Sequence, residues 1–519
     1  MFPRKLSAVL LVLALALSLA APLAAEVKLS SIFSDHMVLQ RDMPIQVWGT
    51  AEPGEKVTVT LGQRTATAVA AGGGSWKAAL EKMSAGGPLT LAVAGKNRVE
   101  IKDVLVGEVW VCSGQSNMNM PIDWGVFGQW GSPESNEALS KINDPELRMF
   151  LVGDQVANAP AADVPGEWKM AKGNEVLKWS AAAYFFGLEL RRELGVPVGL
   201  VKSAVGGTII ESWTRREALL QAAPAMKASI EQWDRKIAAF DEAAYQKQLA
   251  EWQASADKAK AEGKPAPRKP VRTSEQNRIP SSLYNGMIAP LAPYSMRGVI
   301  WYQGESNAGN AAAYGTLFPA MIRDWRSVWG QGDFPFLFVQ LPNFQQRQSE
   351  PGDSKWAELR EAQTTALAVP NTAMAVIIDI GEADNIHPKN KRDVGKRLCL
   401  GALKLAYGRD LVYCGPLYKS MAVEGNKIRL AFTHTGQGLT AKGGELKGFA
   451  IAGADKKFVW AKAVIDGQAV VVSSDAVAAP TAVRYGWADN PECTLYNADG
   501  LPASPFRTDA PAPAAAPKS

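Results

Sequence analysis

Five short runs of apolar residues in the middle of the chain constrain its fold more than any other feature. Helical patterns separate each run from the next, and the runs span residues 104–112, 198–203, 298–302, 336–341 and 375–379. Continuous apolar strands of this kind are typical of a parallel sheet that is covered by helices on both faces. The sequence therefore predicts an α/β domain over residues 104–410.

β-rich segments are predicted on both sides of this domain. Residues 26–103 hold short alternating segments broken by turns, as in PIQVWGTAEPGEKVTVTLG, and this pattern predicts a small antiparallel β-sandwich. Short strands return over residues 411–507. A length of 519 residues exceeds what one hydrophobic core supports, which agrees with several domains. The Ala- and Pro-rich tail at 508–519 is expected to be disordered.

A helical insertion is predicted at about 215–275. Its apolar residues are spaced three and four apart, and they include Ile230, Trp233, Ile237 and Phe240, then Tyr245, Leu249 and Trp252. This spacing indicates amphipathic helices. We expect a surface helix or a helical hairpin here, rather than a coiled coil that binds a partner.

The first 25 residues have the pattern of a secretory signal peptide. Arg4 and Lys5 precede an apolar run over residues 6–20, and small residues end at Ala25. We therefore expect cleavage before Glu26 and a secreted or periplasmic protein with no membrane association afterwards. Cleavage removes two positive charges from the formal net charge of +5, which leaves +3. The remaining Lys and Arg form no basic stripe, which argues against nucleic-acid binding.

Histidine is the scarcest catalytic residue type, with three copies. His36 and His434 lie in the β-rich flanks and are expected to be structural. His387 lies in the loop directly after the last apolar run. Ligands of open α/β sheets bind outside the carboxyl ends of the strands, which favours His387 as a catalytic base.

A carboxylate near His387 is needed to orient its ring. Asp384 precedes His387 by three residues and can accept the Nδ1–H bond, which leaves Nε2 as the base. The alternative role for Asp384 is the N-cap of the helix that follows. Asp379 and Glu382 are nearby rivals with a less suitable spacing.

Ser116 is the candidate nucleophile, because it follows the first apolar run beside Gly114. A serine becomes reactive when an adjacent base takes its proton, and His387 comes from another strand end of the same sheet. The alternative for Ser116 is an ordinary turn residue. The candidate donors to an oxyanion follow the next two strands: Gly206, Gly207, Gln303 and Asn307.

Four motifs in this order resemble the sialate O-acetylesterase family of the SGNH hydrolases. They are GQSNM, GGTIIESW, WYQGESN and DNIHP, and the likeness starts at FSDHMVLQRDMPIQVWG and extends over nearly all of the chain after residue 25. The resemblance implies a flavodoxin-like three-layer α/β/α domain with β-sandwich-like flanks. It also implies a Ser116–His387–Asp384 triad, and it implies no metal or organic cofactor.

The resemblance further implies an oxyanion hole made of the Ser116 N–H, a Gly206 or Gly207 N–H and a side-chain amide. The G-x-N-D block of other SGNH enzymes is absent. The amide is therefore Gln303 or Asn307, and Gln303 is favoured because it lies nearer the strand end.

The predicted function is hydrolysis of acetyl esters of O-acetylated sialic acids. An acetyl-xylan or other polysaccharide acetylesterase is the alternative within the same chemistry. A non-catalytic carbohydrate-binding protein is a third possibility, suggested by the β-rich flanks and the 16 Trp. Arg360 is a candidate to bind the sialate carboxylate.

Overall fold

The structure is a computed structural model that describes residues 26–128 and 132–509. The predicted signal peptide and residues 510–519 of the predicted disordered tail lie outside the described residues. Within the described residues, no helix is both long and apolar enough to cross a membrane. The four cysteines are free, and Cys112, Cys399 and Cys414 are buried.

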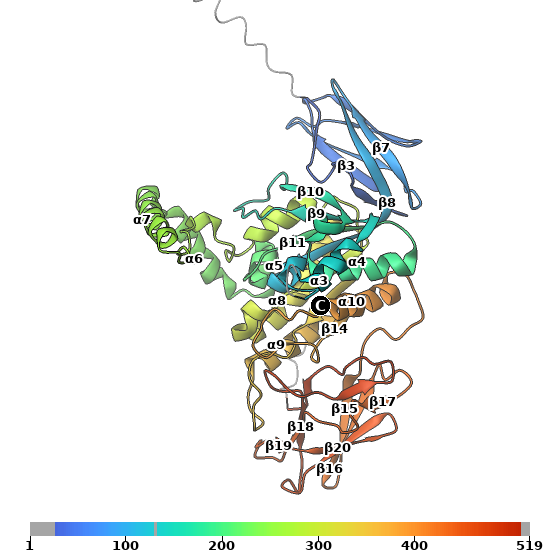
Figure 1. The fold of residues 1–519 in the computed structure, drawn as a ribbon, viewed down its shortest axis with the longest axis vertical. Helices are drawn as coiled ribbons and strands as arrows, with labels where there is room; N and C mark the ends of the chain where they lie inside the picture. The colour runs from blue at the N-terminus through green and yellow to red at the C-terminus, as the bar shows by residue number, and fades with distance from the viewer. Residues whose placement is uncertain (1–25, 129–131, 510–519) are drawn as a thin grey trace, which may run out of the picture.

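A single long strand, β8 (Arg98–Gly114), runs through two parts of the molecule (Figure 1). Its first half alternates in burial and pairs antiparallel with β7 (Gly86–Ala94) of the N-terminal region. Its second half is buried throughout and pairs in parallel with β11 (Val198–Ala204) and β12 (Gly298–Tyr302). The sequence of β8 explains this change, because RVEIKD alternates polar and apolar residues whereas VLVGEVWVC is largely apolar.

The central sheet has the strand order β10-β9-β11-β8-β12-β13-β14. Its other members are β9 (Asn143–Val152), β10 (Gly166–Lys172), β13 (Phe336–Gln340) and β14 (Thr372–Val376). All neighbouring pairs are parallel except β10–β9. Four of the five apolar runs are confirmed as strands. The fifth strand spans residues 372–376, so that only 375 and 376 of the predicted run 375–379 belong to it. Strands β9 and β10 were not predicted.

Helices pack on both faces of the central sheet. On β13, Phe336 and Phe338 lie 6.1 and 5.1 Å from the ring of Phe318 in α8 (Ala311–Trp329). Between them, Leu337 faces Gly401 of α10 (Lys391–Leu405). Neighbouring side chains on a strand point to opposite faces, so α8 and α10 cover opposite sides. Helix α9 (Lys355–Thr364) packs beside α8, and α4 (Ala181–Leu194) packs beside α10.

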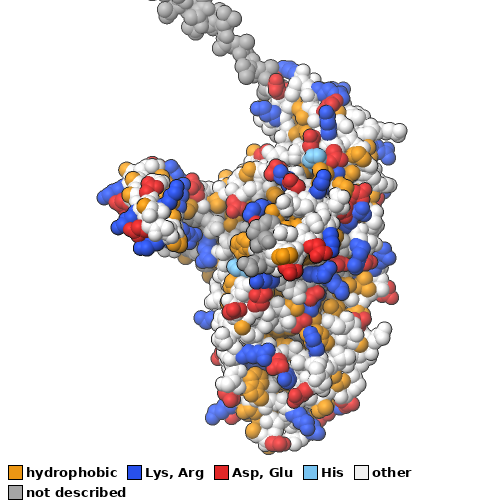
Figure 2. All heavy atoms as spheres, viewed as in Figure 1, with side chains coloured by type: hydrophobic (Ala, Val, Ile, Leu, Met, Phe, Trp, Pro, Cys, Tyr) orange, Lys and Arg blue, Asp and Glu red, His pale blue; other side chains and the backbone are white. Residues whose placement is uncertain are grey.

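The predicted insertion is helical and projects from the body of the molecule (Figure 1). It contains α5 (Arg216–Ala222), α6 (Met226–Ala238) and α7 (Glu242–Ala261), and α7 has no buried residue. Charges of both signs cover the visible surface of this arm (Figure 2). Phe240, in the link between the two long helices, contacts Tyr245 of α7, and Arg272 lies over the Tyr245 ring.

Strands dominate both flanks, as the sequence predicts. The N-terminal flank has a sheet of β1 (Lys28–Leu29), β3 (Ile45–Thr50) and β6 (Ser75–Leu80). In the same flank, β2 (Val38–Gln40), β4 (Lys56–Leu61) and β5 (Arg64–Val69) join β7 and β8. A short helix, α3 (Pro133–Ser140), precedes β9.

The C-terminal flank has two four-stranded sheets and one strand pair. The first sheet contains β15 (Leu417–Glu424), β16 (Lys427–Thr433), β21 (Ala469–Ser473) and β20 (Lys462–Asp466). The second contains β19 (Val459–Trp460), β18 (Phe449–Ala452), β22 (Ala482–Tyr485) and β24 (Phe506–Arg507). The pair is β17 (Leu439–Ala441) with β23 (Leu495–Asn497). Side chains from both sheets form one apolar core.

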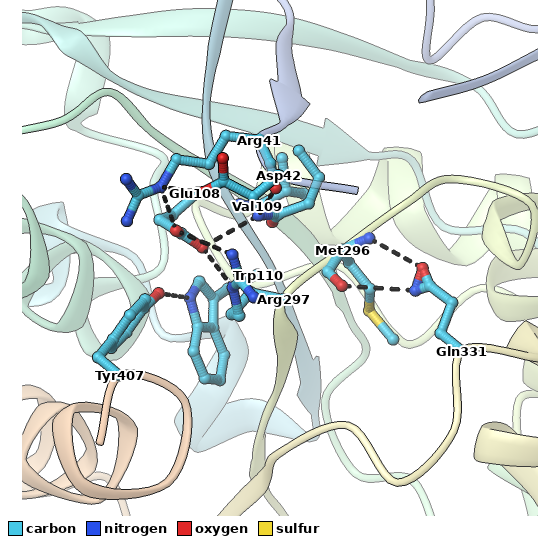
Figure 3. A network of polar contacts seen from close by, with 10 residues as sticks. Arg41, Asp42, Glu108, Val109, Trp110, Met296, Arg297, Gln331 and Tyr407 are labelled. Atoms are coloured by element: carbon cyan, nitrogen blue, oxygen red, sulfur yellow. Dashed lines mark hydrogen bonds and ion pairs between the residues drawn. The ribbon is translucent and has the colours of Figure 1, made fainter. Parts of the chain in front are cut away.

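A buried carboxylate joins the N-terminal region to the central sheet (Figure 3). Glu108 of β8 is fully buried and accepts bonds from Arg41 (2.6 Å), Arg297 (2.8 Å) and Gln40 (3.1 Å). Burial alone raises the pKa of Glu108, but the bonds from Arg297, Arg41 and Gln40 outweigh it, so this pKa lies below its ordinary value. The carboxylate therefore stabilises the fold above the unfolded-state pKa, and this stabilisation is lost as the pH falls through the folded-state pKa.

We expect Glu108→Ala to lower the free energy of unfolding by about 3–5 kcal/mol, because it leaves two guanidinium groups without their buried partner. The matched control is Glu81→Ala, since the Glu81 side chain pairs with Arg64 but is 79% exposed. That variant should change stability by about 0.5 kcal/mol or less. Urea unfolding of both variants measures the difference, and equal losses would contradict the structural role given to Glu108.

Candidate active site

Ser116 lies in a tight turn at the carboxyl end of β8. It is half-buried and begins the short helix α2 (Ser116–Asn119). Gly114 has φ 139°, and a side chain there would come within 2.1 Å of the Tyr302 carbonyl oxygen. The same carbonyl accepts the Gln115 N–H at 3.0 Å. Glycine is thus required at position 114, and the end of β12 fixes where the serine points.

The Gly206–Gly207 loop that follows β11 lies directly beside this turn. Val205 N–H donates to the Gly114 carbonyl at 3.2 Å. A methyl group on Gly206 would lie 3.5 Å from Ser116 Cβ. Within the described part of the chain, the main-chain N–H groups of Ser116, Gly206 and Gly207 donate to no other group. Unpaired amides beside a serine are suited to bind a developing oxyanion.

The two candidate side-chain amides connect loops behind the serine turn. Gln303 is fully buried, and its Nε2 donates to Gln115 Oε1 (3.1 Å), the Thr208 carbonyl (3.1 Å) and Asn307 Oδ1 (2.8 Å). Both N–H groups of the Gln303 amide are therefore engaged in hydrogen bonds. Asn307 Nδ2 donates to Glu211 Oε2 at 3.0 Å, which leaves one amide N–H of Asn307 without a partner among the described residues. The favoured choice, Gln303, has no free donor in this structure.

His387 lies in the loop between β14 and α10. Its ring is half-buried and lies edge-on to the exposed Trp124, with ring centroids 5.6 Å apart. Asn385 holds the main chain of His387 at both its N–H (3.0 Å) and its carbonyl (2.9 Å). Burial, and then the positive charge of Lys391, lower the pKa of His387. The imidazole is thus kept neutral near pH 7, as a general base requires.

The structure brings the His387 loop to the serine turn. Asn117, which follows Ser116, donates from Nδ2 to the Ile386 carbonyl at 2.9 Å, although the two residues are 269 positions apart. Neither Ser116 Oγ nor the His387 ring forms a hydrogen bond with another described residue. Ser116 and His387 thus lie in turns that the Asn117 bond holds next to each other. Both reactive groups are free to contact a substrate.

Asp384 is the carboxylate of this loop that has no partner among the described residues. Its side chain is exposed, and no bond to the His387 ring is formed. Asp379 is paired with Arg397 (2.6 Å) and Tyr496 (3.1 Å). Glu382 accepts bonds from the side chain of Asn385 and the Lys389 N–H. The alternative role of Asp384 as an N-cap is wrong, because Asn390 caps α10.

Arg360 is not available to bind a substrate, because its side chain is enclosed by the protein. It is fully buried and donates to the carbonyls of Leu341, Pro342, Ala488 and Asp489 at 2.8–3.0 Å. Burial lowers the pKa of its guanidinium to about 9. Arg360 thus holds the C-terminal flank against α9 and exposes no surface to a substrate.

A cavity of about 940 Å³ opens beside Gly206 and Gly207. The segment from Arg268 to Arg278, at the base of the helical insertion, forms one wall, and Asp154 lies on another. Arg278 Nε donates to the Gly207 carbonyl at 2.8 Å, which fixes the loop relative to this wall. The insertion therefore contributes to the surroundings of the candidate site.

Three residues of the site were not predicted: Asn117, Trp124 and Lys391. Asn117 had a usable signal, since it directly follows the candidate nucleophile. Trp124 and Lys391 had no such signal, because only the folded structure shows that their side chains lie at the site. Within the described residues, no group of three or more His, Cys, Asp or Glu side chains could hold a metal ion.

Known proteins resemble this chain over most of its length. The family described as carbohydrate esterase, sialic acid-specific acetylesterase, matches residues 106–263 and 272–404. The sialate O-acetylesterase of Mus musculus is 31% identical over 92% of this chain and 94% of its own length. That of Homo sapiens is 30% identical over 92% of both chains. The crystal structure of a carbohydrate acetylesterase from Xanthomonas citri is 41% identical, with a TM-score of 0.79, and covers 93% of this chain and 100% of that one.

All three relatives are named as esterases of carbohydrates or sialic acids, and the matched residues include the serine turn and the histidine loop. The protein is a carbohydrate esterase. More particularly, the chain belongs to the family of sialic acid-specific acetylesterases.

We expect Gly206→Ala to lower kcat/KM for an aryl acetate by about 10-fold or more, because its methyl group would occupy the space beside Ser116. The backbone of Gly206 needs no positive φ, so the melting temperature should stay unchanged. Gly309→Ala is the matched control, since a methyl there meets nothing within 4 Å. Equal kcat/KM values for the two variants would separate Gly206 from the reaction.

Proposed function

We propose that this enzyme hydrolyses the acetyl esters of O-acetylated sialic acids through a covalent acetyl-serine intermediate. The observation that carries the proposal is the position of the Gly206 loop beside Ser116, which gathers unpaired main-chain amides around a serine next to the His387 loop. The mouse and human relatives are named sialate O-acetylesterase, which supports the substrate.

In the proposed reaction, His387 Nε2 takes the proton of Ser116 Oγ, which attacks the acetyl carbonyl carbon. The negative charge that develops on the carbonyl oxygen is bound by the N–H groups of Ser116 and Gly206. Protonated His387 then gives its proton to the sugar oxygen, and the C–O bond breaks. A water molecule, deprotonated by His387, attacks the carbonyl carbon of the acetyl-serine. The bond to Ser116 Oγ then breaks, His387 returns the proton to Oγ, and acetate is released.

We propose that Asp384 orients the His387 ring. Its support is that Asp379 and Glu382, the rival carboxylates, are already paired, whereas Asp384 is free to turn toward Nδ1. Catalytic hydrogen bonds often tighten only when substrate binds. We propose that the amides of Gln303 and Asn307 hold the loop that carries Gly206 in place. The N–H of Asn307 that has no partner among the described residues is proposed as the third oxyanion donor.

We also propose the detailed fold class and the export of the protein. The parallel sheet with helices on both faces supports an SGNH-type three-layer domain, and the strand-rich flanks support two β-sandwich-like domains. The basic and apolar pattern of residues 1–25 supports export to a secreted or periplasmic location.

We expect Ser116→Ala and His387→Ala each to lower kcat by about 10³-fold or more, and their double variant to lose little further, because triad members act as a unit. Asp384→Asn should lower kcat by about 10²-fold or more, because the ring tautomer is no longer enforced. Glu382→Gln tests the rival carboxylate and should cost less activity than Asp384→Asn. Additive losses, or a larger loss in Glu382→Gln than in Asp384→Asn, would contradict the proposed triad.

The substrate is tested by comparing kcat/KM for a 9-O-acetylated sialic acid and an acetylated xylo-oligosaccharide. A polysaccharide acetylesterase is the second candidate, because the structural relative from Xanthomonas citri is described only as a carbohydrate acetylesterase. The cavity beside Gly206 is lined by three basic side chains, Arg268, Lys269 and Arg278, and by two acidic ones, Asp154 and Glu275. A net positive lining suits the carboxylate of a sialic acid, which neutral xylan lacks.

We therefore expect kcat/KM to favour the sialic acid by about 10-fold or more. Arg268→Gln should reduce this preference and leave the hydrolysis of an aryl acetate unchanged, and Ser116→Ala provides the background rate. A preference for the xylo-oligosaccharide would replace the sialic acid by a plant polysaccharide in the proposal.

A further inference from the structure

The main-chain carbonyls on either side of His387 each accept a hydrogen bond from a buried side chain. One donor is Asn117, which follows Ser116, and the other is Lys391, which also binds Asn117. Asn117 Nδ2 donates to the Ile386 carbonyl at 2.9 Å. Lys391 Nζ donates to the Pro388 carbonyl at 2.6 Å and to Asn117 Oδ1 at 2.6 Å. Asn117 and Lys391 are 274 positions apart in the chain, and both side chains are fully buried.

The amide of Asn117 uses both of its N–H groups and its oxygen in buried hydrogen bonds. The second N–H of the Asn117 amide donates to Glu305 Oε1 at 2.5 Å. The Lys391 ammonium bonds two oxygens, and it also lies 5.4 Å from the centre of the Tyr302 ring. An amide that makes three buried hydrogen bonds has one allowed orientation, and a lysine held at three sides has little rotamer freedom.

We propose that Asn117 and Lys391 are positioning residues that set the place of the His387 base relative to the Ser116 nucleophile. This inference rests on the proposed function. Asn117 is covalently next to Ser116, so a bond from its amide to residue 386 fixes the histidine loop to the serine turn itself. The Lys391 bond to residue 388 fixes the other side of His387. A shift of about 1 Å in such a pair costs about 10²-fold in rate.

The charge of Lys391 also acts on His387. Burial lowers the pKa of Lys391 to about 7, and the carboxylates of Glu305 and Glu382 partly offset this effect. The titratable groups around Lys391 are thus Glu305 from the loop after β12, Glu382 and His387 from the histidine loop, and Tyr302 from β12. While Lys391 is protonated, its charge disfavours a second positive charge on His387 and lowers the His387 pKa.

Two near-isosteric variants test the proposal with an aryl acetate as the probe. Asn117→Asp keeps the acceptor for Lys391 and removes the donor to residue 386, so kcat should fall about 10²-fold with KM within about threefold of the wild-type value. Lys391→Met removes the ammonium group. It should lower kcat similarly, and it should move the acidic limb of the kcat/KM profile to higher pH, because the His387 pKa rises when the repulsion is lost.

Lys396→Met is the matched control, since Lys396 is an exposed lysine of the same helix that has no partner among the described residues. Its pH profile and kcat should equal those of the wild type. A merely structural role for Lys391 would lower the melting temperature without moving the acidic limb. Wild-type kcat in Asn117→Asp, or an unmoved acidic limb in Lys391→Met, overturns the inference.

Ser116→Ala separates this inference from the function on which it rests. If Ser116→Ala is inactive while Asn117→Asp and Lys391→Met behave as the wild type, the positioning role alone is wrong. If Ser116→Ala keeps its activity, the proposed acetyl-serine mechanism itself is wrong, whatever the other variants do.

Discussion

Strand β8 is the constraint on which the rest of the structure depends. Its first half is a member of the N-terminal β region, its second half is the centre of the parallel sheet, and the Ser116 turn follows its last residue. The buried Glu108 lies where the two halves meet and binds arginines from both sides. The direction of Ser116, the proposed nucleophile, is therefore fixed by a strand that pairs with the N-terminal strands at one end and with the parallel strands at the other.

The site built at the end of this strand relies more on the main chain than on side chains. Gly114 permits the close approach to the Tyr302 carbonyl, and the Gly206 backbone lies beside Ser116 with room for only a methyl group between them. Buried amides of Gln303 and Asn307 connect the loops behind them. The proposed oxyanion pocket of backbone N–H groups would need little rearrangement during the reaction, because the strands that precede these groups fix their directions.

The sequence alone predicts the parts of this arrangement that depend on local pattern. The five apolar runs are visible because both faces of each strand are buried, and Ser116 and His387 are found from their places after such runs. Strand β9 was missed because it begins with Asn143, Asp144 and Pro145, which are residue types typical of turns. The burial of Arg360 and the full bonding of Gln303 depend on contacts between distant segments, which no local pattern records. The same is true of the contact between Asn117 and Lys391.

The role of Arg360 has a consequence for any attempt to reduce the enzyme to a smaller catalytic fragment. Its guanidinium binds two carbonyls of the C-terminal flank, and Tyr496 of that flank binds Asp379 just before the histidine loop. In a chain that stopped near residue 410, the buried guanidinium of Arg360 would lose two of its four carbonyl acceptors. Asp379, just before the histidine loop, would lose its hydrogen bond from Tyr496. The C-terminal strands are thus an integral part of the catalytic unit rather than a removable appendage.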